Sequence, residues 1–218
     1  MLNFKNSVAS AILALGACTG AHAQFALPSL PGVMNLLGGS GNSGSDLGGQ
    51  QDALVRGYVA ANKDVLTANG LMAQALGLKG EAAASAATSA SLTEGATKDA
   101  LEESNKAVAA STSAVAAELA KQPVLDAGAK AIYAQGLATL ASGVIKFVGV
   151  GKNVGAMGSS LKSISPMQLP RLQSAVYVVS NFPGSMSNVS DALRNATAFA
   201  QSQDIPVPAD ATAALAAL

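Results

Sequence analysis

The stretch LVRGYVAANKDVLTANGLMAQA, residues 54–75, decides the fold class of this chain. Its apolar residues recur at steps of four and three: Leu54, Tyr58, Ala61, Val65, Ala68, Met72 and Ala75. This spacing places them on one face of an α-helix, because a strand would need alternation at every second residue. The pattern predicts an amphipathic helix that begins near Asp46, and Gly77 and Gly80 supply stop signals after it.

The same four-and-three spacing recurs farther along the chain. It is carried by Leu101, Asn105, Val108, Thr112, Val115 and Leu119, by Tyr133, Leu137, Leu140, Val144 and Phe147, and in weaker form by residues 172–179 and 186–200. No segment alternates with period two over a useful length. We therefore expect an all-α protein, an antiparallel bundle of about four to five helices with a flexible, partly apolar N-terminal extension. A break at Gly95 would divide residues 81–121 into two helices, and without it they form one.

Several residues predict where the helices end or how they pair. We expect Pro123 in the first turn of a helix, where its missing N–H costs nothing. The glycines between Gly149 and Gly158 predict a loosened helix end, and residues 182–184 (Phe-Pro-Gly) predict an interruption. Asn105 and Thr112 lie within an otherwise apolar seam, so they either fix its register or indicate a partly wet interface.

The first 23 residues have the features of a bacterial export signal. Lys5 precedes an apolar stretch at residues 8–17, and Ala21-His22-Ala23 forms a small-residue cleavage site. Cleavage after Ala23 leaves Gln24 as the new N-terminus, and the apolar core is shorter than the about 20 residues that span a bilayer. The expected location is the periplasm or the exterior. The alternative is a lipoprotein anchored through Cys18, because residues 15–18 (LGAC) resemble a lipobox.

Four regions follow from composition: a signal peptide at 1–23, an apolar segment and Gly/Ser-rich tether at 24–50, a helical domain at 51–204 and a C-terminal tail at 205–218. The apolar segment is punctuated by proline, and the tether after it is of a flexible type. The segment is a candidate docking peptide for a partner; folding back on its own domain, or partial disorder, is the alternative. Its candidate contact residues are Phe25, Leu27, Leu30, Val33, Leu36 and Leu37.

The residues that usually carry catalysis are scarce. The only cysteine and histidine, Cys18 and His22, leave with the signal, and these two residue types supply most nucleophiles, general bases and transition-metal ligands. Residues 149–152 (GVGK) lack the Walker spacing. The acidic residues Asp99, Glu102 and Glu103 alternate with lysines and indicate a solvated face. We therefore predict no enzyme activity, no cofactor, and no catalytic, cofactor-binding or metal-binding residue.

The net charge of the chain and the distribution of its charged residues indicate which kinds of partner it can attract. Removing Lys5 with the signal leaves twelve basic and thirteen acidic residues, which offers nucleic acid no general attraction. Residues 121–171 nevertheless carry six bases and one acid, which suits a solvated face, an acidic partner or lipid headgroups.

The sequence thus predicts an exported, non-catalytic helical protein that binds a protein partner, itself or an apolar ligand. The faces from Tyr58 to Met72 and from Tyr133 to Phe147 are expected to form a core or a groove. The alternative is a membrane-active protein that inserts the apolar residues 131–158. Against insertion, Lys146 within this segment is costly in a membrane.

Overall fold

The computed structural model describes residues 46–218, and this part of the chain is helical with no strand. Its helices are α1 (Asp46–Ala75), α2 (Lys79–Ser91), α3 (Lys98–Leu119), α4 (Ala127–Leu161), α5 (Gln173–Ser202) and α6 (Ala209–Ala216), with a 3-10 turn, η2 (Leu169–Leu172), before α5. The predicted all-α class is confirmed. The described residues hold six α-helices where about four to five were expected, because a gap around Gly95 separates α2 from α3 and the C-terminal tail forms α6.

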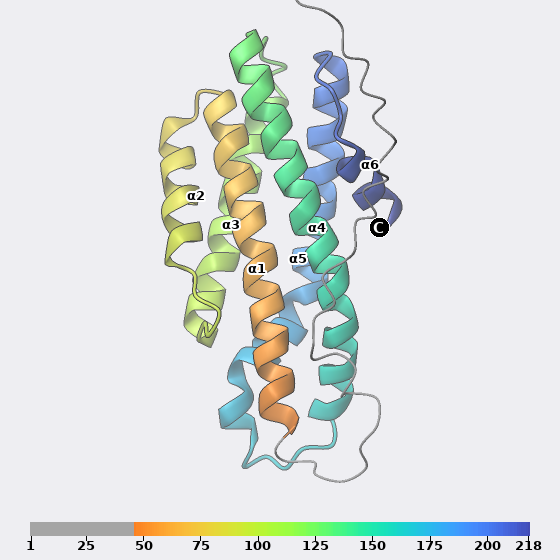
Figure 1. The fold of residues 1–218 in the computed structure, drawn as a ribbon. Coiled ribbons are helices and arrows are strands. Elements are labelled where there is room, and N and C mark those ends of the chain that lie inside the picture. Colours follow the sequence, from red (N-terminus) through yellow and green to blue (C-terminus); the bar gives the residue numbers. More distant parts are fainter. Residues whose placement is uncertain (1–45) are drawn as a thin grey trace, which may run out of the picture. The chain divides into compact units, whose positions relative to one another are not determined.

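The core lies where α1 and α4 run along each other, with α3 and α5 behind them (Figure 1). All seven seam residues from Leu54 to Ala75 are buried. Tyr58 packs edge-on against Phe147 with ring centroids 5.5 Å apart, and Tyr133 packs against Phe199 at 5.2 Å. The two faces that the sequence marked as core or groove are therefore core, because aromatic rings from facing helices fill the space between them.

Two glycines bring α4 unusually close to α1. A Cβ added at Gly136 would lie 3.1 Å from the backbone oxygen of Ala68, and one added at Gly143 would lie 3.2 Å from Cβ of Asp64. Distances this short leave no room for a side chain at either position. The pair is spaced by seven residues, so both glycines lie on the same face of α4.

Two of the predicted helix ends are wrong. The glycine-rich residues 149–158 lie inside α4, where buried Val150 and Met157 keep the helix packed. Pro183 lies inside α5, whose buried residues Val178 and Val189 flank it on both sides. Burial on each side outweighs the local preference of glycine and proline to end a helix.

The predicted place of Pro123 is also wrong, because α4 begins four residues after it. Asp126 caps the helix, and its Oδ1 accepts a hydrogen bond of 2.8 Å from the backbone N–H of Ala129. An aspartate at this position satisfies one of the unpaired N–H groups of the first turn. The start of α4 is therefore set by a capping side chain rather than by the proline.

The polar residues of the α3 seam pair with polar residues on α1. Asn69 Nδ2 donates to Ser111 Oγ at 2.8 Å and to Thr112 Oγ1 at 3.0 Å. Asn105 Oδ1 accepts from Tyr58 Oη at 3.1 Å. These bonds favour the interpretation that Asn105 and Thr112 fix register, since sliding one helix along the other would leave buried polar groups unpaired.

The ends of α1 and α5 share one hydrogen-bond pattern. After α1, Gly77 has a φ of 78°, and the N–H of Leu78 donates to the carbonyl of Ala73 at 2.8 Å. After α5, Asp204 has a φ of 55°, and the N–H of Ile205 donates to Ala200 at 2.8 Å. Both are Schellman endings, in which glycine is favoured at the left-handed position.

Replacing Asp204 with glycine should stabilise the protein by about 0.5–1 kcal/mol, because glycine adopts a left-handed backbone without steric cost. Gly77→Ala is the matched reverse change. It should cost about 1 kcal/mol through the left-handed backbone alone, because no atom lies within 4 Å of the added Cβ. Urea unfolding followed by circular dichroism measures both. Equal effects of the two substitutions would contradict the assignment of backbone strain to Asp204.

Candidate functional site

A groove of about 630 Å³ lies between the turn η2, the first half of α5 and the start of α3. Its lining residues are Lys98, Pro166, Leu169, Pro170, Gln173, Val176, Tyr177, Ser180 and Asn181. The volume falls within the range of about 300–1,000 Å³ that is usual for small-molecule sites. The groove is thus large enough for a compact organic ligand.

The walls of the groove follow from local sequence. Pro166 and Pro170 interrupt the helical chain between α4 and α5, and η2 carries proline at its start. On α5, residues spaced by three and four face the same side, which brings Gln173, Val176 and Tyr177 to the groove. Aliphatic and proline side chains make up one part of the lining, and a few polar tips make up the rest.

A hydrogen-bond network connects the groove to the core. The side chain of Asn105 lies close enough to Tyr177 to lower the pKa of its hydroxyl. Asn105 Oδ1 also accepts from Ser185 Oγ at 3.0 Å, and Ser185 lies 2.8 Å from the hydroxyl of Tyr58. One asparagine thereby joins the groove wall to α1 and to the middle of α5.

Burial keeps the tyrosines of this network protonated. It raises the pKa of Tyr177 above its ordinary value, and it raises the pKa of Tyr58 to about 12. Near neutral pH both hydroxyl groups are therefore neutral and serve as hydrogen-bond partners.

Lys98, at the edge of the groove, begins a row of charges on α3. Its Nζ lies 4.0 Å from Glu102, which forms a shorter contact of 2.9 Å with Lys106. The hydrogen bond from Lys106 is the main cause of the lowered pKa of Glu102. All three side chains are substantially exposed, so this is the solvated face expected from the sequence. The ion-pair contact of Lys98 is long, and its side chain is part of the groove lining.

Most of the residues singled out from the sequence lie outside the described part of the chain. These are the cleavage residues Ala23 and Gln24, the alternative anchor Cys18, and the docking candidates Phe25, Leu27, Leu30, Val33, Leu36 and Leu37. Within residues 46–218, no group of three or more acidic, cysteine or histidine side chains is placed to hold a metal ion. The run at 149–152 lies within α4 and forms no phosphate-binding loop.

The groove itself was missed by sequence reasoning. The sequence feature that indicates this region is the pair Pro166 and Pro170, which mark a non-helical connection with apolar residues between them. That signal shows where a loop lies, but it does not show that the loop closes over α5 and the start of α3. The juxtaposition depends on tertiary packing, which periodicity alone does not encode.

Helix α4 is long and apolar enough to cross a membrane by length and composition, and among residues 46–218 no other helix meets this test. It also supplies core residues, and 44% of its most apolar window is buried. Lys146 pairs with Asp64 on α1 at 2.7 Å, and Ser142 Oγ donates to the same carboxylate at 2.7 Å. A core helix of a soluble protein passes the same test, so its hydropathy is weak evidence for a membrane span.

Comparison with family models, curated proteins and solved structures finds no match to this chain.

Proposed function

We propose that this chain is an exported, non-catalytic protein whose helices form an antiparallel bundle and whose groove binds a small apolar molecule. The observation that carries the proposal is the groove beside α5, with its apolar lining and few polar tips. Ligand sites of this kind combine an apolar surface with a small number of polar groups that orient the ligand. Of the three partner classes expected from the sequence, the apolar ligand has the most support from the described residues.

The polar groups of the groove favour a ligand with one polar or anionic end. Lys98 offers a cation at the lining, and Gln173, Ser180 and Asn181 offer hydrogen-bond partners. Asn181 Nδ2 donates to the carbonyl of Tyr177 at 2.9 Å, and the Oδ1 of Asn181 can accept a hydrogen bond from a ligand. An apolar body with a single anionic group would satisfy both parts of the lining.

Insertion of residues 131–158 into a membrane is the second candidate, and it has less support. Tyr133, Leu140 and Phe147 of this segment are fully buried against other helices, so insertion would require the core to open. Export, with a lipid anchor at Cys18 as the alternative, stays a prediction from the signal sequence. Partner docking through residues 25–37 likewise remains a prediction.

The fluorescent probe 1-anilinonaphthalene-8-sulfonate tests the groove, since it joins an apolar body to one anionic group. Leu169→Asp places a charge in the lining and should weaken probe binding about tenfold. Ile145→Asp is the matched control, because Ile145 is 45% exposed on α4 outside the groove lining and Leu169 is 40% exposed. Circular dichroism checks that both variants stay folded. Equal probe binding by the wild type and Leu169→Asp would refute the proposal.

A further inference from the structure

We infer that the connection between α4 and α5, residues 162–172, docks on the surface of an anionic lipid bilayer. We call these residues the basal loop. Three loop residues, Pro166, Leu169 and Pro170, also line the groove, but the proposal rests on Met167, Lys162 and Arg171, which do not. It also differs from insertion of α4, since the helices stay folded and only the loop meets the headgroups.

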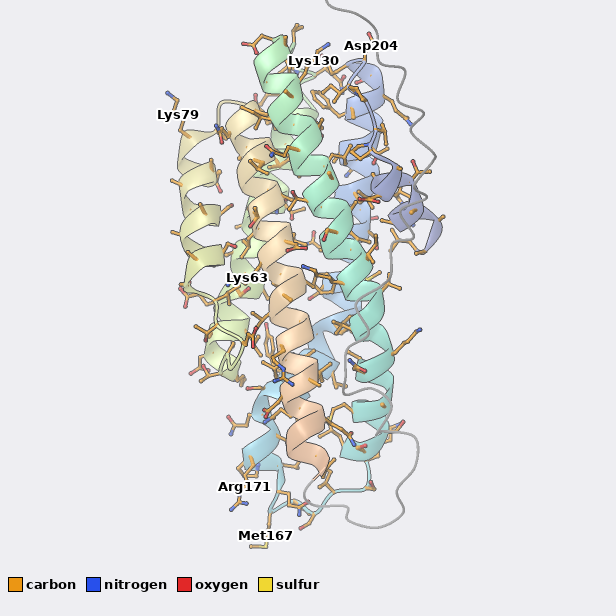
Figure 2. All side chains as sticks on the ribbon, viewed as in Figure 1. Lys63, Lys79, Lys130, Met167, Arg171 and Asp204 are labelled. Carbon is orange, nitrogen blue, oxygen red and sulfur yellow. The ribbon has the colours of Figure 1, made fainter. Side chains whose placement is uncertain are left out.

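The basal loop exposes apolar side chains at one end of the helical domain. Met167 is 89% exposed and does not line the groove. Figure 2 shows Met167 and Arg171 at one extremity of the domain, opposite Lys130 and Asp204. A projecting methionine offers an apolar surface outside the groove lining. This shape suits a soft acceptor such as the boundary between headgroups and acyl chains.

In the described part of the chain, bases without an ion pair lie within and before the basal loop in the sequence. Between residues 127 and 190 the chain has five bases and no acid. Lys146 pairs with Asp64, whereas Lys152, Lys162 and Arg171 form no ion pair within residues 46–218. Cations near an apolar anchor are attracted by the negative potential of acidic phospholipids.

Two acidic residues on neighbouring elements, Asp52 and Glu94, lie outside the basal loop. Asp52 and Glu94 line a separate hollow together with Arg56. That hollow shares none of its lining with the loop residues 162–172. The basal loop therefore presents its bases without an acidic side chain of its own.

The chain also enters the domain beside the basal loop. Gln51, in the second turn of α1, donates to the carbonyl of Arg171 at 3.3 Å and accepts from the N–H of Ala175 at 3.4 Å. Residues 24–45, which precede α1 in the sequence, carry no charged side chain and include the apolar segment 25–37. A single weak anchor binds membranes only marginally, and a second signal makes the binding stable. The apolar segment 25–37 is a candidate for that second signal.

Vesicle sedimentation with the full exported protein tests the inference. The protein should sediment with vesicles of equal phosphatidylcholine and phosphatidylglycerol, and at least tenfold less with phosphatidylcholine alone. Met167→Asp and the double variant Lys162→Glu/Arg171→Glu should each weaken binding to the anionic vesicles at least tenfold. Raising the salt to about 0.5 M should release the protein, because screening removes the attraction of the bases.

Val124→Asp is the control, since Val124 is 90% exposed and precedes the opposite end of α4. It should bind like the wild type. The inference is overturned if the wild type ignores anionic vesicles, if it binds neutral vesicles equally, or if Met167→Asp and Val124→Asp behave alike. Normal binding of the fluorescent probe by Met167→Asp would show that the groove survives, so failure of one proposal leaves the other intact.

Discussion

Gly136→Ala is expected to lower the free energy of unfolding by about 1–3 kcal/mol, although the same change stabilises most helices. The new methyl group would lie 2.9 Å from Cγ of Met72, 3.1 Å from the backbone oxygen of Ala68 and 3.2 Å from Cβ of Leu71. Met72 can move, but the backbone of α1 cannot yield without separating the two helices. Overpacking of this kind outweighs the gain of about 0.5–1 kcal/mol from helix propensity.

Gly149→Ala is the matched control, because Gly149 lies on the same helix with no atom within 4 Å of the added Cβ. It should stabilise the protein by about 0.5–1 kcal/mol. Urea unfolding of the two variants therefore gives changes of opposite sign. If both variants are stabilised, α1 and α4 are not in the close contact described here.

The buried face of α1 could be predicted because one physical cause controls it. Every seam residue from Leu54 to Ala75 is apolar and spaced to meet the core, so local periodicity and tertiary burial agree. Helix α1 is described from Asp46 onward, the region where the periodicity predicts a helix. Long periodic segments are predictable because many residues independently indicate the same helix and the same buried face.

Prediction failed where local preference and packing disagree. Pro183 disfavours a helix locally, yet residues on both sides of it pack into the core and α5 continues. Gly136 looks like an ordinary glycine of an Ala-rich helix, and its role appears only when Ala68 of α1 is seen beside it. The groove depends likewise on where the basal loop meets α5, which no single segment determines.

Stability is expected to fall by about 2 kcal/mol between pH 10 and pH 12 through Tyr58 alone. Burial raises the pKa of Tyr58 from 10.0 to about 12, so the unfolded chain releases this proton two pH units earlier than the folded protein. The contribution is present below pH 10 and is lost as the pH rises toward 12, at no more than about 1.4 kcal/mol per unit. Burial also raises the pKa of Tyr133, whose hydroxyl donates to the carbonyl of Ala196 at 3.1 Å, so it adds to the loss.

Tyr58→Phe separates the ionisation of Tyr58 from the titration of the lysines, because the lysines titrate in both the wild type and the variant. At neutral pH the variant should lose about 1 kcal/mol with its hydrogen bonds to Asn105 and Ser185. Above pH 10 its stability should decline less steeply, so the variant overtakes the wild type near pH 11. Urea unfolding at pH 8, 10 and 11, with phenolate absorbance as a second probe, measures the crossing. Parallel pH profiles would mean that Tyr58 ionises normally in the folded protein, and that the network beneath the groove is open to water.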